Sequence, residues 1–263
     1  MAETGRLTVP ARTSFASPIT LVRIAIVVAI LVIWEAAARS GLLFRDVVPP
    51  LPIIGRAVID LLADKTYYWH LGVTAGEIGL AMLIGGLAGL AVGILLGGNR
   101  LLARAYEAYL YYLGPTPKII FFPIMIMWFG VGPGSKVAMG VLSCFFPVAL
   151  SAAAGMRTID QVLIRVGRSF RARTWQMVTK IYLPAMRHPI VNGVRLGLGV
   201  AIIGTLLAET KLSNQGVGFL IINAYSTFSM PRMYALLIVL FVLSIGVNAL
   251  VGRLGGADPI RQK

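Results

Sequence analysis

Long apolar runs dominate this chain and constrain its fold more than any other feature. Several of them reach the roughly 20 residues that an α-helix needs to cross a lipid bilayer. Of the 263 residues, 57% are hydrophobic and only 13% are charged. A soluble domain carries about 25% charged residues. The sequence therefore predicts an all-α membrane protein, with one membrane domain and no separate soluble domain.

Polar and proline-rich segments divide the apolar sequence into about six transmembrane helices, in a membrane domain over residues 21–252. The expected spans are residues 21–39, 73–98, 108–130, 137–156, 190–208 and 233–251. Three alanines near the end of the first span are compatible with signal-peptidase cleavage, but the five later apolar runs favour a retained helix. Residues 1–20 are expected to form a disordered tail, because they are polar and contain Pro, Ser and Thr.

Basic residues concentrate in the segments that alternation of the spans places on one side. These are the tail at residues 1–20, the tail at residues 253–263, Asn99–Glu107 and the loop Arg157–Pro189. Lys and Arg are retained on the cytoplasmic side, so both termini are predicted to be cytoplasmic. This topology accounts for the net charge of +14 without nucleic-acid binding.

The loop Arg157–Pro189 contains the only long basic segment between apolar runs. Its apolar residues recur at helical spacing, which predicts two short amphipathic helices joined near Ala172–Thr174 and lying along the membrane surface. Between Leu163 and Pro189 the segment has no acid, and its basic residues are Arg165, Arg168, Arg171, Arg173, Lys180 and Arg187.

The third span is expected to be bent, because Pro115, Pro117 and Pro123 remove backbone donors. Carbonyl groups freed at membrane depth are tolerated only against protein or a watery cavity. We therefore place candidate pathway residues on this span and the next. They are Lys118, Phe121, Phe122, Met125, Cys144 and Phe145. Two interpretations of Lys118 stay open, a pathway residue or a lysine whose ammonium reaches the interface.

Small residues recur every four positions in two spans. In the second span they are Gly85, Gly89, Gly93 and Gly97, and in the fifth Gly193, Gly197 and Ala201. Such a face lets a second helix approach closely in lipid. The alternative is that membrane helices simply tolerate these glycines.

Catalytic and metal-binding motifs are missing from the sequence. The two histidines, His70 and His188, fall on opposite sides of the predicted membrane. The acids Glu35, Glu77, Glu107 and Glu209 are expected near span ends as packing charges. We therefore predict a non-catalytic membrane subunit driven by another protein. A self-sufficient channel or secondary carrier, and a membrane scaffold that recruits a cytoplasmic partner, remain alternatives.

The basic loop resembles the signature of permease subunits of binding-protein-dependent ABC importers. That signature reads E-A-A-x-x-x-G, then nine residues, then I-x-L-P. Ile181-Tyr182-Leu183-Pro184 matches its end, and the spacing fits back to Arg165. The start departs from the pattern, since Arg165 stands in place of Glu and Arg171 in place of Gly.

Other stretches are similar to the nitrate, sulfonate and taurine branch of that family. They include Trp128-Phe129-Gly130-Val131-Gly132, Phe145-Phe146-Pro147, and Glu209 followed by Gly216-Val217-Gly218. The resemblance covers residues 34–251. It implies the type I ABC importer permease fold, a place in a bacterial inner membrane, and uptake of a small anionic solute.

The resemblance also implies partners. They are two cytoplasmic ABC ATPase subunits, a second permease chain that forms a homodimer with this one, a periplasmic or lipid-anchored solute-binding protein, and membrane lipid. ATP and Mg would be bound by the ATPase, with no cofactor in this chain. The coupling residues implied are Leu163, Arg165, Gly167, Arg168, Phe170, Arg171, Arg173, Leu183 and Pro184. The loop arginines would face acids on the ATPase, or alternatively bind lipid phosphates.

Overall fold

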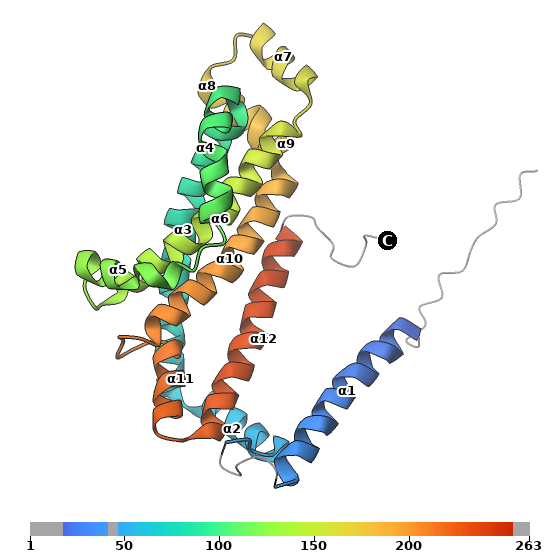
Figure 1. Ribbon diagram of the computed structural model, residues 1–263. Coiled ribbons are helices and arrows are strands. Elements are labelled where there is room, and N and C mark those ends of the chain that lie inside the picture. Colours follow the sequence, from blue (N-terminus) through green and yellow to red (C-terminus); the bar gives the residue numbers. More distant parts are fainter. Residues whose placement is uncertain (1–17, 42–46, 255–263) are drawn as a thin grey trace, which may run out of the picture.

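The computed structural model describes residues 18–41 and 47–254, and every regular element in these two ranges is helical (Figure 1). The greater part of each predicted tail, residues 1–17 and 255–263, lies outside these ranges. Five of the described helices are long and apolar enough to cross a membrane. They are α1 (Pro18–Arg39), α3 (Lys65–Gly98), α6 (Pro133–Arg157), α10 (Arg187–Glu209) and α12 (Met230–Leu254).

The sixth apolar segment is broken. Helix α4 (Arg100–Leu113) ends before two prolines, and the chain continues through η1 (Lys118–Phe121) into α5 (Phe122–Phe129) after a bend of 92°. Pro115 and Pro117 lie within the break, so the predicted irregularity is confirmed. The segment Asn99–Glu107, expected to be a loop, is instead almost wholly the first half of α4, and the Asn99 side chain caps that helix by accepting from Leu101 N at 2.9 Å.

Shorter helices occupy the two ends of the molecule (Figure 1). At one end lie α2 (Leu51–Ala63) and α11 (Val217–Ser226). At the other end the predicted loop is mostly helical, and contains α7 (Gln161–Ser169), α8 (Thr174–Met177), the π-helical turn η2 (Val178–Tyr182) and α9 (Leu183–Ala185).

Helix α6 is the centre of the bundle and packs between α3 and α10. The predicted small-residue faces of α3 and α10 allow both helices to pack closely against α6. A Cβ atom added to Gly93 would lie 2.5 Å from both Ala149 O and Ala152 Cβ of α6, and one added to Gly197 would lie 2.9 Å from Val148 Cγ2. Because these glycines have no side chain, the helix backbones meet directly and the dispersion contacts are dense.

Helix α11 continues the path of α10 toward the end of the molecule where α2 lies (Figure 1). Its apolar residues Val217, Leu220 and Ala224 form a core with α12, and Leu61 of α2 and Tyr67 of α3 belong to the same cluster. With 10 residues, α11 is about 15 Å long, which is half the hydrocarbon thickness of about 30 Å. Helix α11 is therefore too short to cross the layer by itself, and it extends the path of α10 toward the α2 end.

Two polar contacts connect the elements at the α2 end. The Glu35 carboxylate of α1 accepts a hydrogen bond from Leu51 N at 2.8 Å, and Asp64 pairs with Arg232 at 3.1 Å. Asp64 also accepts from Thr66 N at the start of α3, and this hydrogen bond is the largest of the effects that lower the pKa of its carboxyl. The rest of α1 is mostly apolar and exposed. None of the residues in its most apolar stretch is buried by the described chain.

The close α3–α6 contact gives a paired prediction. Gly93→Ala places a methyl group against α6 and should cost about 1–3 kcal/mol, which lowers the unfolding midpoint by about 2–4 °C per kcal/mol. Gly86→Ala, about two turns away, is the matched control because no atom lies within 4 Å of its added Cβ. It should be neutral or stabilise the helix. Thermal unfolding of the purified chain in mild detergent measures both, and equal midpoints would contradict the packing described.

Candidate functional sites in the basic loop and the membrane core

Helix α7 is the first part of the basic loop, and its ends are set by local hydrogen bonds. Asp160 caps the start, accepting from Val162 N at 2.8 Å, and Ser169 Oγ donates to Arg165 O at 3.0 Å near the end. Gly167 is buried against the next turn of chain, since an added Cβ would lie 2.4 Å from Ile181 Cδ1 and 2.6 Å from Met177 Sδ. These contacts hold α7 against α8 and η2.

The turn after α7 explains why the family signature has glycine at position 171. Ala172 N donates to Gly167 O at 3.0 Å and Arg171 N to Arg168 O at 2.9 Å. This pair of bonds is the Schellman motif, whose C′ residue takes a left-handed conformation and is usually glycine. Here that residue is Arg171, with φ of 50°. The turn geometry of the family is thus kept by a side chain that adopts it at a cost of about 1–2 kcal/mol.

Leu183 and Pro184 stand where the loop turns into α10. Proline has no N–H group to donate to the carbonyl four residues back, and the π-helical turn Val178–Tyr182 comes directly before it. Leu183 is half-buried and Pro184 is exposed. This widened turn carries the chain from the loop into the membrane helix.

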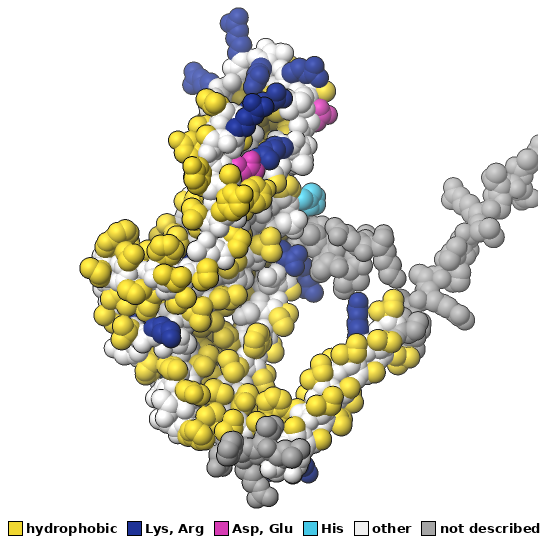
Figure 2. Space-filling view, viewed as in Figure 1, with side chains coloured by type: hydrophobic (Ala, Val, Ile, Leu, Met, Phe, Trp, Pro, Cys, Tyr) yellow, Lys and Arg dark blue, Asp and Glu magenta, His cyan; other side chains and the backbone are white. Residues whose placement is uncertain are grey.

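An apolar face of α7 and its following turn is exposed, although the loop is otherwise strongly basic. Phe170 is 83% exposed and Trp175 74%, and Val162, Leu163 and Val166 each stay about half exposed. Figure 2 shows Lys and Arg side chains gathered at this end of the molecule. A rigid helix that presents large apolar groups among cations is typical of a docking surface.

The predicted pathway residues are placed in three different surroundings. Met125 and Phe145 line a groove of about 700 Å³ between α3, α5 and α6. Phe121 is exposed nearby, whereas Phe122 is buried against Met139 and Ala208. Cys144 is fully buried in the α3–α6 contact, 3.4 Å from Ala81 O.

Lys118 is partly buried at the break between α4 and η1. Its ammonium donates to Gly114 O and to Thr116 O, and lies 5.1 Å from the centre of the Phe146 ring. Gly114 follows the last residue of α4, so the lysine satisfies a carbonyl that the broken helix leaves free. Its ammonium is therefore held by backbone carbonyls at the break.

Three charged residues that were assigned no site role meet inside the bundle. Glu77 of α3, Lys136 of α6 and Glu209 of α10 are 4%, 1% and 1% exposed. Thr74 Oγ1 donates to Glu209 Oε1, and Gly218 N donates to Glu209 Oε2, both at 2.6 Å. The prediction that these acids are scattered is therefore wrong, and Glu77 lies well inside α3, whereas Glu209 is the last residue of α10, as expected.

The depth of this intramembrane cluster, Glu77, Lys136 and Glu209, follows from helix lengths. Glu77 is 12 residues into α3, so it lies about 18 Å along the helix from its start. Glu209 ends α10, and α11 covers about 15 Å beyond it. Both values place the cluster inside the bundle and away from its two ends, at about one third of the length of α3 from the α2 end. The sequence signal for this arrangement is the Gly216-Val217-Gly218 turn and the short apolar stretch after it, which form the start and body of α11.

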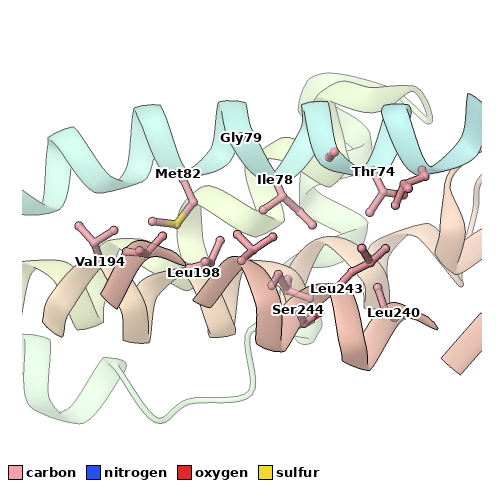
Figure 3. Close-up of a pocket in the computed structure, with 14 residues that line it drawn as sticks. Thr74, Ile78, Gly79, Met82, Val194, Leu198, Leu240, Leu243 and Ser244 are labelled. Carbon is pink, nitrogen blue, oxygen red and sulfur yellow. The ribbon is translucent and has the colours of Figure 1, made fainter. Parts of the chain in front are cut away.

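An apolar groove of about 340 Å³ passes the cluster on the α12 side (Figure 3). Its labelled residues Ile78, Met82, Leu198 and Leu243 are apolar, and Thr74 at one end is the hydroxyl that donates to Glu209. This lining suits lipid chains or another helix better than a polar solute. Among the described residues, no group of three or more His, Cys, Asp or Glu side chains is placed to hold a metal ion.

The left-handed turn at position 171 can be tested directly. Arg171→Gly restores the residue that this conformation favours and should leave amide hydrogen exchange of residues 161–182 equal or slower. Arg168→Gly is the matched control, because it puts glycine inside α7 at a cost of about 1 kcal/mol and should speed exchange. If Arg171→Gly exchanges as fast as Arg168→Gly, the Schellman turn is not the solution conformation.

Comparison with known proteins agrees with this geometry. Residues 81–256 match the family model described as binding-protein-dependent transport system inner membrane component. The taurine transport system permease protein TauC of Escherichia coli K12 is 30% identical, over 86% of this chain and 85% of the relative. The putative aliphatic sulfonates transport permease protein SsuC of Bacillus subtilis 168 is 30% identical, over 81% and 78%.

A solved structure shows the same fold. A chain of the MetNI methionine ABC transporter, in an inward-facing conformation, superposes with a TM-score of 0.59 and 20% identity, over 79% of this chain and 96% of that one. The apolar helices, the broken span and the ordered basic loop are thus the type I importer permease fold. The chain belongs to the family of binding-protein-dependent transport system inner membrane components, the multi-pass permease subunits of ABC importers.

Proposed function

We propose that this permease takes up a small anionic solute of the sulfonate, taurine or nitrate class, without catalytic activity of its own. The observation that carries the proposal is α7, a rigid helix whose apolar and basic face has no cover in the described chain. ATP and Mg are bound and used by two separate ATPase subunits. The solute class rests on the relatives, which are named for taurine and aliphatic sulfonates.

Helix α7 and its turn are the surface on which each ATPase subunit docks. Phe170 and Trp175 are large, exposed and close in sequence, and such residues are frequent anchors of protein interfaces. Arg168, Arg171 and Arg173 surround them and fit a groove with acidic residues. Movement of the ATPase pair would then push on a helix that Gly167 and Met177 hold against the rest of the loop.

The basic end of the molecule is cytoplasmic in this proposal. The positive-inside rule places the end where Lys and Arg side chains gather in Figure 2, around α7, in the cytoplasm. Both termini lie on that side, since six crossings separate them. The opposite end, with α2 and α11, then faces outward and receives a periplasmic or lipid-anchored solute-binding protein.

Two copies of the chain enclose the pathway. Within one chain, α1 is apolar and almost uncovered, and the groove beside α5 exposes Trp128 and Phe129. Lipid and a second copy would together cover these surfaces. The break at Lys118 then lies at mid-depth beside the pathway, where irregular helices line cavities. Phe121, Met125 and Phe145 are the predicted pathway residues on or near the groove; Cys144 and Phe122 would act only by packing behind it.

Charge reversal on α7 tests the docking proposal. Arg168→Glu should weaken association with the ATPase subunit by about tenfold, equivalent to about 1.4 kcal/mol, because an exposed cation is replaced by a repelling anion. The wild-type complex should also weaken as salt is raised. Copurification in mild detergent over a range of salt concentrations measures both effects.

Arg56→Glu on α2 is the matched control, because Arg56 is an exposed arginine at the opposite end of the molecule. It should leave ATPase association unchanged. Equal copurification of Arg168→Glu, Arg56→Glu and the wild type would rule out α7 as the docking surface, whereas loss of solute uptake with the complex intact would point to the pathway instead.

A further inference from the structure

The intramembrane cluster holds more than packing charges, because its three members have unequal hydrogen-bond partners. Glu209 is the best satisfied of them. Its two carboxylate oxygens each accept a 2.6 Å bond, from Thr74 Oγ1 and Gly218 N. Thr74 Oγ1 in turn accepts from Val217 N at 2.8 Å. A carboxylate that receives two short bonds at the first turn of α11 is in the ionised form, which the positive end of the helix also favours.

Glycine is required around this carboxylate. A Cβ on Gly216 would lie 2.3 Å from Glu209 Oε1, and Gly216 has φ of 99°. A Cβ on Gly218 would lie 2.6 Å from the Glu209 Cβ. The Gly216-Val217-Gly218 turn thus wraps the carboxylate closely and ties α11 to α10 and, through Thr74, to α3.

Lys136 supplies one positive charge, but carbonyl groups occupy its ammonium. It donates to Leu212 O at 2.7 Å, to Gly132 O at 3.2 Å and to Val131 O. These three acceptors use all the donors of an ammonium group. Lys136 therefore balances one carboxylate through space and has no N–H left for the second.

Glu77 is the member without sufficient partners. Its carboxyl lies beside the Glu209 carboxyl, and its second oxygen, Oε2, has no partner among the described residues. The hydroxyl of Thr205, one turn before Glu209, is likewise buried without a partner there. Two ionised carboxylates and one ammonium would leave a net negative charge buried inside the bundle, where an uncompensated charge is very costly.

We infer that Glu77 and Glu209 form a proton-binding pair, in which Glu77 carries the proton and donates it to the Glu209 carboxylate. The cluster is then electrically neutral, and the hydrogen bond joins α3 to α10 at the point where α11 begins. When two carboxyl groups share one site, the charge of the first disfavours ionisation of the second, so the pair retains one proton. The site takes a proton and not a metal ion, because a proton needs only one further lone pair of Glu209, whereas no group of three or more His, Cys, Asp or Glu side chains among the described residues is placed to hold a metal ion.

Other charged groups near the cluster do not alter this balance. Helices α5 and α11 carry no Asp, Glu, Lys or Arg. Lys118 of η1 is held by the carbonyls at the end of α4, and His70 of α3 accepts from Gly216 N at 3.0 Å through Nδ1. From α12, Arg232 pairs with Asp64 near the α2 end. Removal of the proton would therefore put two like charges side by side and loosen the start of α11.

The two glutamates should respond differently to the same substitution, and this is the first test. Glu77→Gln keeps a donor toward Glu209 and should retain the wild-type unfolding midpoint at neutral pH. Glu209→Gln turns an amide N–H₂ toward Thr74 or Gly218, which are themselves donors, and should lower the midpoint by about 5 °C or more. The full chain in lipid nanodiscs is the sample, and Asp60→Asn, an exposed acid on α2, is the control.

The proton itself is tested by pH and by infrared spectroscopy. The native pair binds one proton more than the unfolded chain, so wild-type stability should fall as pH rises through its deprotonation. The Glu77→Gln variant cannot lose that proton, so its stability should fall less as pH rises. The wild type should also show the infrared carbonyl band of a protonated carboxyl, absent in Glu77→Gln. This band is measured without any unfolding and needs no Glu209 variant to fold.

Several outcomes would overturn the inference. A wild type and Glu77→Gln with parallel pH profiles, or no protonated-carboxyl band, would show that Glu77 is ionised. A rise in the unfolding midpoint on replacing choline chloride by sodium chloride at equal ionic strength would assign the site to a metal cation. None of these measurements depends on solute uptake or on copurification with the ATPase. A negative result for the proton-binding pair is therefore distinguishable from a negative result for the docking proposal.

Discussion

Helix ends inside the apolar layer must find partners for their free backbone groups, and the charged residues of the membrane core meet that requirement. Lys118 bonds the carbonyl that follows α4, and Lys136 bonds carbonyls that follow α5 and α10. Glu209 accepts from the amide of Gly218 in α11. Cations therefore stand at the carboxyl ends of helices and the anion at an amino end, as the helix dipoles favour. Each buried charge is compensated partly by the helix it caps.

The molecule accordingly combines a rigid part with a part held by polar contacts. Along much of the contact between α3 and α6, glycines such as Gly89 and Gly93 bring the two backbones together, and the contact is made by close packing. Where helices are interrupted, at α5 and α11, polar bonds replace some of this packing. Conformational change in an importer requires elements that rearrange without unfolding the bundle. The interrupted helices suit that role, because polar bonds can be exchanged while close packing cannot be strained far.

Local pattern was sufficient for much of this fold. The apolar runs predicted the membrane helices, the prolines predicted the bend near Lys118, and the spacing from Arg165 to Pro184 located the basic loop. Depth was harder to predict. The second span was started at Val73, whereas α3 begins at Lys65 with polar and aromatic residues in its first turns. Because of that difference, Glu77 lies 12 residues inside its helix and not in the first turns. Glu209 ends α10 as expected, but its contacts with Thr74 and Gly218 depend on long-range packing that the sequence pattern does not show.

The length of α3 has a mechanical consequence. Its 34 residues form one helix from the α2 end to the basic end, and α6 packs along it up to the residues that lead into α7. At 1.5 Å per residue this is a rod of about 51 Å. If its far end stays in place, a displacement of about 5 Å at the loop turns the rod by only about 6°, and the movement shrinks in proportion to the distance from that fixed end. At the level of Glu77 about a third of it would remain, under 2 Å, which is a change on the scale of single hydrogen bonds. The bundle would therefore act as a lever that converts a large displacement at the basic end into a small adjustment at the level of Glu77.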